Sequence, residues 1–192
     1  MDQHGGFQSK AEPGLWLWKA ADRGGKYMRE PFTIIRVLAL LGWLALTFVA
    51  AAVGAAASAE APTFYAQLDR PSWAPPAFLF GPVWSVLYVL MAVSAWLVWS
   101  ESKQPTRRTP LLLFVVQLAL NALWSWIFFA WRLGSVAFFE IVVLWVLVAA
   151  TFVSFVRVSR LAGALLLPYL AWVGFATVLT WAIWQRNPML LK

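Results

Sequence analysis

Five long segments with almost no charged residues dominate this sequence. They are residues 37–59, 71–100, 109–131, 133–156 and 161–185, each 23 to 30 residues long. Only the segment 133–156 contains a charged residue, Glu140. About 20 apolar residues in a helix cross a hydrocarbon core of roughly 30 Å, and a helix satisfies its own backbone polar groups in lipid. The sequence therefore predicts an all-α membrane protein, a bundle of five transmembrane helices near residues 34–57, 78–100, 109–130, 134–156 and 161–185.

The composition excludes several kinds of site. The chain of 192 residues is 62% hydrophobic and 12% charged, against about 25% charged in soluble proteins. It contains no cysteine, so a disulfide framework and a thiolate metal site are impossible. The only histidine, His4, lies in the polar N-terminal segment. We therefore expect no metal site and no obligatory cofactor within the membrane part.

The basic residues flank the apolar segments. A net charge of +7 and a pI near 10.3 would suit nucleic acid only on a folded polar surface, so the bilayer, and not nucleic acid, is the expected partner. With five spans, the N-terminal tail and the links 101–108 and 157–160 share one side of the membrane. That side carries 11 of the 15 Lys and Arg residues. The positive-inside rule then places the N-terminus in the cytoplasm and the C-terminus outside.

Residues 1–33 form a polar, basic extension. It has no apolar stretch long enough for a cleaved signal peptide. Two interpretations remain open: a disordered tail, or contact with the membrane interface through the Trp-containing stretch 15–19. The links between the later segments are short, so residues 34–188 are expected to fold as one five-helix domain, followed by a short tail at 189–192.

The stretch 58–77 is the most informative part outside the helices. Its two consecutive prolines, Pro75 and Pro76, suit the first turn of a helix and not its interior. The second spanning helix should therefore begin just there. At roughly 20 residues the stretch is longer than most connections, and such loops are often binding lids. The alternative is a simple connector that carries interfacial aromatic residues.

Aromatic residues recur on single faces of the predicted helices. Several of the 14 tryptophans lie too deep in their helices to belong to an interfacial belt. The faces at helical spacing are Trp84 with Tyr88, Asn121 with Trp124 and Phe128, and Trp172 with Ala176. If these faces converge, they form a slot for a flat conjugated molecule. Ordinary helix packing, with Asn121 in an interhelical hydrogen bond, is the alternative.

Glu140 is the only acidic residue within a predicted span. An ionisable group inside a membrane suggests a function. However, no span contains a second acidic residue or a histidine, so a two-carboxylate mechanism lacks its second member. Structural pairing with Arg132, eight residues earlier, is the other interpretation.

Three stretches resemble one known family. RPSWAPP at 70–76 is followed by FGPVWSVLY at 80–88, QLALN at 117–121 by Trp124 and Phe128, and PYLAW at 168–172 by Phe175, Ala176, Trp184 and Asn187. In order and spacing, over residues 34–188, they resemble the tryptophan-rich sensory protein / translocator protein family in its bacterial form. The resemblance implies a five-helix bundle in the bacterial inner membrane, usually a homodimer, with a pocket closed by the loop between helices 1 and 2.

The same resemblance implies a ligand class and a set of site residues. The family binds protoporphyrin and related tetrapyrroles, and cholesterol in animals. Carried over to this sequence, the ligand-binding residues are Trp73, Trp84, Tyr88, Asn121, Trp124, Trp172, Ala176 and Leu179. In some bacterial relatives the light-dependent degradation of protoporphyrin depends on tryptophans that match Trp84 and Trp172. The sterol motif of the animal proteins is altered here to Leu179, Trp181 and Gln185, so sterol recognition is not expected.

The expected function is a membrane receptor or sensor that binds porphyrins and similar flat apolar ligands. Photo-oxidation of the bound ligand at Trp84 and Trp172 would be its only enzymatic activity. The alternative is a carrier that moves tetrapyrroles or other hydrophobic intermediates across the membrane. Against a carrier, no span shows the paired interrupted helices of many secondary transporters.

Overall fold

The computed structural model describes residues 30–101 and 107–192, and every regular element in that part of the chain is helical. The elements are α2 (Glu30–Ala57), α3 (Ala61–Gln67), the 3-10 turn η1 (Ala77–Leu79), α4 (Phe80–Glu101), α5 (Arg108–Ser125), the π-helical turn η2 (Trp126–Ala130), α6 (Gly134–Val158) and α7 (Arg160–Arg186). Within these ranges, five segments are long and apolar enough to cross a membrane: Thr33–Ala57, Ala77–Glu101, Arg108–Ala130, Gly134–Val158 and Arg160–Arg186. The prediction of five such helices is confirmed, whereas the prediction for the N-terminal extension concerns residues that lie mostly outside the described ranges.

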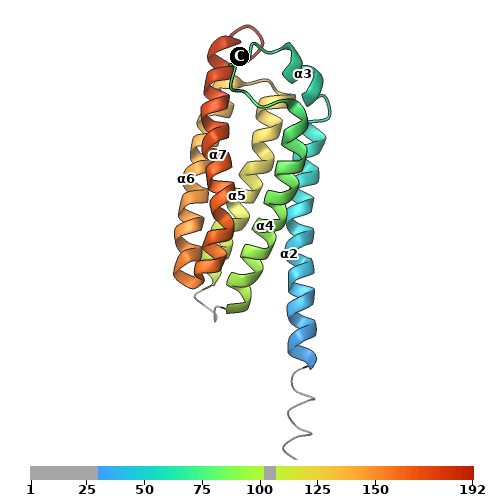
Figure 1. Cartoon of the computed structure of the whole chain (residues 1–192), viewed down its shortest axis with the longest axis vertical. Helices are drawn as coiled ribbons and strands as arrows, with labels where there is room; N and C mark the ends of the chain where they lie inside the picture. The colour runs from blue at the N-terminus through green and yellow to red at the C-terminus, as the bar shows by residue number, and fades with distance from the viewer. Residues whose placement is uncertain (1–29, 102–106) are drawn as a thin grey trace, which may run out of the picture. The chain divides into compact units, whose positions relative to one another are not determined.

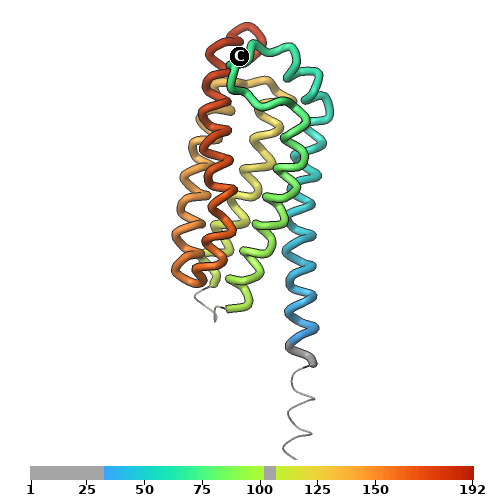
Figure 2. The backbone as a smooth tube through the Cα atoms, viewed as in Figure 1, coloured from blue at the N-terminus to red at the C-terminus, as the bar shows by residue number. Residues whose placement is uncertain are grey.

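Contacts divide the chain within α2, into residues 1–38 and 39–192. The second unit contains the remaining turns of α2 and all later elements. Within it, α7 packs mainly along α6 and also against α4, while α5 packs against α6 (Figures 1 and 2). Single residues or short turns join α5 to α6 and α6 to α7, so these neighbours run antiparallel.

The helix ends follow from local sequence. Pro76 is the N-cap of η1, which leads directly into α4, so the helix begins just after the two prolines as predicted. At the start of α7 the Ser159 side chain accepts a hydrogen bond from the Ala162 backbone N–H. A serine cap of this kind replaces one of the backbone partners that the first turn lacks.

The sequence suggested that the segment 58–77 is non-helical, but α3 lies within it. Pro62 stands in the first turn of α3, where a missing backbone N–H costs nothing. The helix is only seven residues long, and a helix of that length is unstable in isolation. Burial of Phe64 and Tyr65 stabilises it, and so brief an element leaves no periodic pattern in the sequence.

The core of residues 39–192 has two parts. The first, called here the closed-end cluster, contains large and fully buried side chains of α4 to α7, among them Met91, Phe114, Leu144, Phe155 and Tyr169. The second, called here the loop-end cluster, brings residues of α3 and its loop together with residues of η2, α6, α7 and the C-terminus. Its members are Phe64, Tyr65, Leu68, Ile127, Phe128, Ala137, Leu179, Ile183 and Leu191.

One glycine explains how closely α6 and α7 approach each other. A Cβ atom added to Gly163 on α7 would collide with the side chain of Val156 on α6. Glycine therefore permits a backbone approach that any larger residue would prevent.

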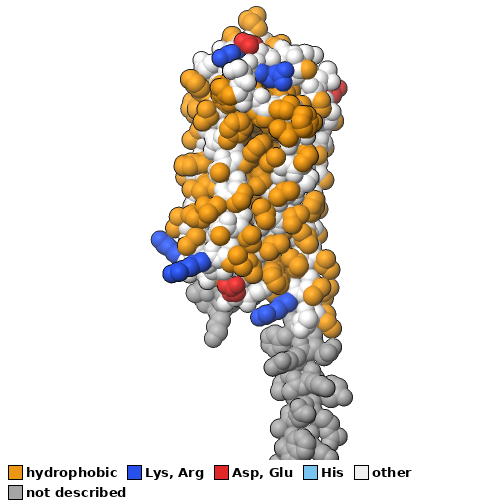
Figure 3. All heavy atoms as spheres, in the orientation of Figure 1, with side chains coloured by type: hydrophobic (Ala, Val, Ile, Leu, Met, Phe, Trp, Pro, Cys, Tyr) orange, Lys and Arg blue, Asp and Glu red, His pale blue; other side chains and the backbone are white. Residues whose placement is uncertain are grey.

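The outer surface of the helices is apolar. Large hydrophobic side chains such as Leu112 on α5, Phe139 on α6 and Val178 on α7 are exposed. In Figure 3, hydrophobic side chains cover the visible face of residues 39–192 between its two ends, where the charged side chains gather. Contact of such a surface with lipid tails costs no free energy, whereas its exposure to water would be unfavourable.

Candidate functional site

A cavity of about 640 Å³ lies within residues 39–192. This volume is in the range of small-molecule sites, roughly 300–1,000 Å³. The cavity is lined by residues of α2, α3, η1, α4, α5, η2 and α7. Its position under α3 puts the segment 58–77 where the sequence expected a lid.

Small residues on α2 form one wall. Ala51, Ala52, Gly54 and Ala55 follow one another over little more than one turn. A Cβ atom on Gly54 would lie 3.2 Å from the Ser125 Oγ atom, so glycine allows α2 to lie close to α5. Nearby, the indole N–H of Trp126 donates to the Val53 backbone oxygen at 3.1 Å. The wall thus leaves space for a ligand while the helix stays attached to its neighbour.

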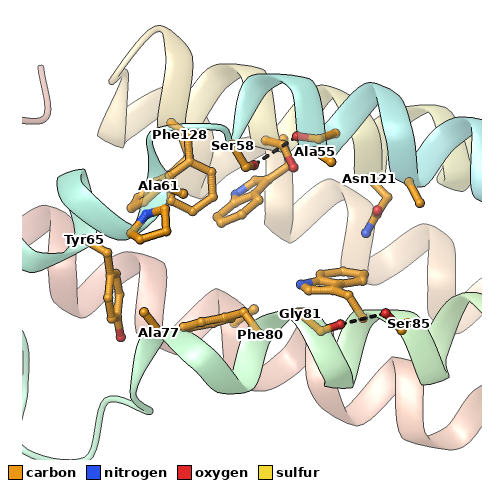
Figure 4. A pocket seen from close by; sticks show the side chains of 18 of the residues that line it. Ala55, Ser58, Ala61, Tyr65, Ala77, Phe80, Gly81, Ser85, Asn121 and Phe128 are labelled. Atoms are coloured by element: carbon orange, nitrogen blue, oxygen red, sulfur yellow. Dashed lines mark hydrogen bonds between the residues drawn. The ribbon is translucent and has the colours of Figure 1, made fainter.

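Aromatic rings form the opposite walls. On α4, Trp84 and Tyr88 lie with their ring centroids 5.6 Å apart and their planes tilted by 33°. On α5 and η2, Trp124 and Phe128 stack at 5.1 Å and 12°. Figure 4 shows Phe80 of α4 on one side of the cavity and Phe128 with Asn121 on the other. Flat walls that face each other across a gap favour a flat ligand.

Few polar groups face this cavity. The hydroxyl group of Ser58, just after α2, donates to the Gly54 backbone oxygen, and that of Ser85 on α4 donates to the Gly81 backbone oxygen, both at 2.9 Å. Tyr88 donates its hydroxyl proton to the Asn121 Oδ1 atom at 2.8 Å. These hydroxyl groups are already engaged, whereas the buried indole N–H of Trp124, which also lines the cavity, has no hydrogen-bond partner among the described residues. The rest of the lining offers mainly apolar and π surface to a ligand.

Two sets of hydrogen bonds hold the segment 58–77, called here the lid, in place. Tyr65 on α3 donates to the Pro75 backbone oxygen at 2.9 Å, which closes the loop upon itself. The buried side chain of Asn187 pairs with Asp69 in both directions, accepting from its N–H at 2.8 Å and donating to its oxygen at 2.9 Å. An exposed ion pair between Arg186 and Asp69, at 3.8 Å, adds little in water.

Burial of the Tyr65 side chain raises the pKa of its phenol above the ordinary value, and nearby Arg70 partly opposes this. The Arg70 guanidinium lies 4.7 Å from the centre of the Tyr65 ring. The hydroxyl group therefore keeps its proton, and its bond to Pro75, throughout the neutral range.

The structure brings six of the eight predicted ligand-binding residues to the cavity: Trp84, Tyr88, Asn121, Trp124, Ala176 and Leu179. The other two lie outside its lining. Trp73 is half exposed and meets Phe175 edge-on at 5.9 Å. Trp172 meets Phe80 edge-on at 6.0 Å, and of these two residues only Phe80 lines the cavity. That any of the eight binds a ligand stays a prediction.

Sequence reasoning missed the contribution of α2, α3 and Phe80. Phe80 begins the motif at 80–88 and forms part of the cavity wall, a role that the sequence did not predict. The run of alanines and glycine at 50–57 was available as a signal. Residues this small cannot fill the space beside an aromatic face, so such a run on a spanning helix indicates either close helix contact or a cavity.

The suggested pairing of Glu140 with Arg132 is wrong for the described part of the chain. Arg132 lies in the turn before α6 with a positive φ of 57°, and its guanidinium lies 4.8 Å from the centre of the Phe64 ring. Both carboxylate oxygens of Glu140 are buried and have no hydrogen-bond partner among residues 30–101 and 107–192. The turn geometry directs Arg132 toward α3 and away from α6.

Within the described ranges, no group of three or more His, Cys, Asp or Glu side chains could hold a metal ion.

Comparison with known proteins agrees with this architecture. The chain matches the TspO/MBR family over residues 42–185, a range that includes every residue lining the cavity. It is 43% identical to the human translocator protein over 126 residues, 65% of this chain and 75% of that protein. It is 39% identical to the tryptophan-rich protein TspO of Chlorobaculum tepidum over 142 residues, 71% of this chain and 90% of that protein. The tryptophan-rich sensory protein of Cereibacter sphaeroides is 35% identical over 148 residues, 75% of this chain and 91% of that protein.

Proposed function

Because this chain belongs to the TspO/MBR family of multi-pass membrane proteins, we propose that it is a membrane receptor that binds porphyrins and similar flat apolar molecules beneath α3. The observation that carries the proposal is the cavity of about 640 Å³ between aromatic walls. A tetrapyrrole ring is flat, conjugated and largely apolar, so stacking and dispersion supply its affinity. Its iron-free form needs no axial ligand from the protein.

The position of α3 above the cavity suggests how a bound ligand could be sensed. A ligand beneath α3 would contact Tyr65 and Ala61, which line the cavity and belong to the lid itself. Occupancy would thereby alter the segment 61–76 at the membrane surface, where a partner in signalling could detect it. The name of the Cereibacter sphaeroides relative, tryptophan-rich sensory protein, supports this function.

Photo-oxidation of the ligand would be a second activity of the same site. The light-excited porphyrin and dioxygen supply the chemistry, and the protein supplies orientation and an oxidisable indole. Trp84 lines the cavity, whereas Trp172 is outside the lining and contacts Phe80, which belongs to it. Of the two tryptophans, Trp84 is therefore expected to react first.

A fluorescence titration in the dark tests binding. The full chain in detergent or lipid is titrated with protoporphyrin, and quenching of tryptophan emission is recorded. Ala61→Leu and Trp84→Ala should weaken binding, and Trp181→Phe, on the exposed face of α7, should not. Saturable binding that none of the cavity variants affects would place the ligand elsewhere and contradict the proposal.

Illumination then tests the chemistry. At saturating protein and equal occupancy, the decay of porphyrin absorbance is compared for the wild type and the Trp84→Phe, Trp172→Phe double variant. Phenylalanine keeps a flat wall at a cost of about 1 kcal/mol, but it is harder to oxidise than indole. Slower decay in the variant supports the photochemical activity, and equal rates would remove it.

A carrier is the alternative, and the observation in its favour is that the human relative is named translocator protein. Flux of protoporphyrin into sealed vesicles separates the two, because a receptor binds without net transport.

For orientation, the basic asymmetry of the sequence supports a cytoplasmic N-terminus. A reporter inserted in the link 102–106 that reported from outside the cell would contradict this topology. The homodimer implied by the resemblance stays a prediction.

A further inference from the structure

The cavity is not enclosed equally on all sides. Its walls on α5, η2 and α7 consist of buried or half-buried residues such as Asn121, Phe128 and Ala176. The lining residues on α2 and α4 include several that are exposed, namely Phe48, Ala52, Ala55, Gly81 and Ser85. Both groups face the same cavity, so facing it does not by itself account for the exposure. The cavity therefore reaches the outer surface of the protein between α2 and α4.

Helix packing leaves the same side open. Among the described residues, the backbone of α4 lies close to those of α5, α6 and α7 but not to that of α2. α2 is held instead from the side of η2, where the Val53 backbone oxygen accepts from the Trp126 indole N–H. Figure 4 shows Ala55 of α2 on one side of the cavity and Gly81 and Ser85 of α4 on the other. The two helices thus form the edges of a gap.

Space around Gly81 shows that this gap is not filled by a side chain. A Cβ atom added to Gly81 would meet no atom of another element within 4 Å, whereas one added to Gly54 would lie 3.2 Å from the Ser125 Oγ atom. On its α5 side α2 is therefore closely packed, and on its α4 side there is room. The alanines and the serine at the edges are too short to close it.

The gap lies within the apolar part of both helices. Neither the range 48–55 on α2 nor the range 81–85 on α4 contains a charged residue. The outward-facing neighbours Val49, Val53 and Val86 are exposed and apolar. Because α2 ends at residue 57, the range 48–55 begins about 14 Å from the helix end. The gap therefore borders the hydrocarbon core of the bilayer and not the water at its surface.

We propose that this gap is a lateral portal through which flat apolar ligands pass between the hydrocarbon core and the cavity. The passage of a ligand rests on the proposed function, whereas the opening itself does not. Apolar rings partition into lipid, so the membrane presents them to the portal at a higher concentration than water presents them to the lid. The lid contacts a bound ligand and retains it, but it is not the entrance. In the ligand-free protein, acyl chains of the bilayer lie against the portal.

Spin labelling tests the opening without any ligand, and the chain contains no cysteine that would interfere. Labels are attached to Ala52→Cys and Ser85→Cys at the portal, and to Val86→Cys as the lipid-facing reference, in the full chain in lipid. Electron paramagnetic resonance then gives the collision rates with dioxygen, which concentrates in hydrocarbon, and with a water-soluble nickel chelate. We expect the two portal labels to meet dioxygen about as often as the reference label does, and to meet the chelate rarely.

Two results overturn the portal. Rare collisions with dioxygen at both portal labels would mean that the gap is closed, or that a second copy of the chain covers it. Frequent collisions with the nickel chelate would mean that the cavity opens to water at this side.

Stopped-flow fluorescence with protoporphyrin in the dark tests the passage of a ligand. Ser85→Trp places a large ring in the portal, and Val86→Trp places the same ring on the lipid-facing surface one residue away. An obstacle at an entrance slows movement in both directions, so association and dissociation rates should both fall by about tenfold in Ser85→Trp. Ala52→Trp, on the opposite edge, should act in the same way, and Val86→Trp should retain the wild-type rates.

An unchanged association rate in both portal variants overturns entry by this route. A ligand that enters beneath the lid would give that result, with faster dissociation because the added ring occupies part of the cavity. If protoporphyrin does not bind to the wild type, the proposed function fails together with the passage that rests on it. The opening is still decided in that case, because the collision rates are measured without ligand.

Discussion

The two ends of the bundle are built from equally apolar helices but are packed differently. At the closed end, large residues such as Phe114, Phe155 and Tyr169 have no exposed surface and fill the space between α4, α5, α6 and α7. At the loop end, small residues of α2, α4 and α7 face aromatic walls around a cavity of about 640 Å³.

This difference teaches that hydrophobicity alone does not make a core. Dispersion requires partner atoms on every side, and alanine and glycine do not reach far enough to supply them. In a membrane, apolar lipid surrounds the outside of the bundle. No hydrophobic driving force therefore pulls the helices together to close the cavity. The packing of the loop end therefore depends on the segment 58–77 that covers it, whereas the packing of the closed end depends on its large buried side chains.

The largest expected effect concerns the closed end. Phe114 stacks on Phe155 at 5.9 Å and meets Trp43 edge-on at 5.7 Å. Phe114→Ala should lower the free energy of unfolding by about 3 kcal/mol through the cavity that it leaves. Phe48→Ala, at the half-exposed wall of the existing cavity, should cost less than about 1 kcal/mol. Equal losses in detergent unfolding curves would break the comparison between the two ends.

Filling the loop end should reduce ligand affinity. Ala176 lines the cavity one turn after Trp172, and Ala176→Leu places extra atoms where a ring would lie. We expect a loss of about 2 kcal/mol, roughly thirtyfold in Kd. Ala171→Leu, on an exposed face of the same helix, is the matched control and should leave Kd unchanged. Unchanged affinity in Ala176→Leu would place the ligand outside this cavity.

Loosening the lid should affect kinetics more than the fold. Asn187→Ala removes both hydrogen bonds to Asp69 and leaves its backbone groups without these partners. The ligand dissociation rate, measured by stopped flow, should rise by about tenfold. Arg186→Ala, which removes only the exposed ion pair, should change it by less than about twofold. If the two variants behave alike, the lid is not held by Asn187.

The smallest effect concerns pH. The pKa of the Tyr65 phenol is raised by burial above its ordinary value, so the stabilisation from its protonated form is complete below about pH 10 and is lost as the pH rises further. Proteolysis of the segment 61–76 should therefore accelerate in strong alkali. Tyr65→Phe should lose about 1 kcal/mol at neutral pH and show no alkaline step. A wild-type protein without that step would show that the Tyr65 bond to Pro75 does not hold the lid.

Spanning helices and their ends were accessible from the sequence because they depend on local properties. Length, charge placement and the Pro75–Pro76 pair predicted where α4 begins, and the spacing of Trp84 with Tyr88 and of Asn121 with Trp124 predicted two faces that do line the cavity. The same spacing argument put Trp172 beside Ala176, and there it was insufficient. Helical period tells which residues share a face, but not which neighbour stands in front of them.

By itself, then, the sequence determined the five apolar helices, their order and the aromatic faces that they carry, because these follow from residue type and a period of 3.6. Only the tertiary structure decided that Phe80 and not Trp172 lines the cavity, and that α3 forms within the loop. It also decided that Arg132 turns toward Phe64, so that Glu140 has no partner among the described residues. A cavity forms where no side chain fills the space between helices, and a polar group lacks a partner where no other polar side chain comes close enough. Both are properties of how helices pack in three dimensions, so neither is encoded in any one segment of the chain.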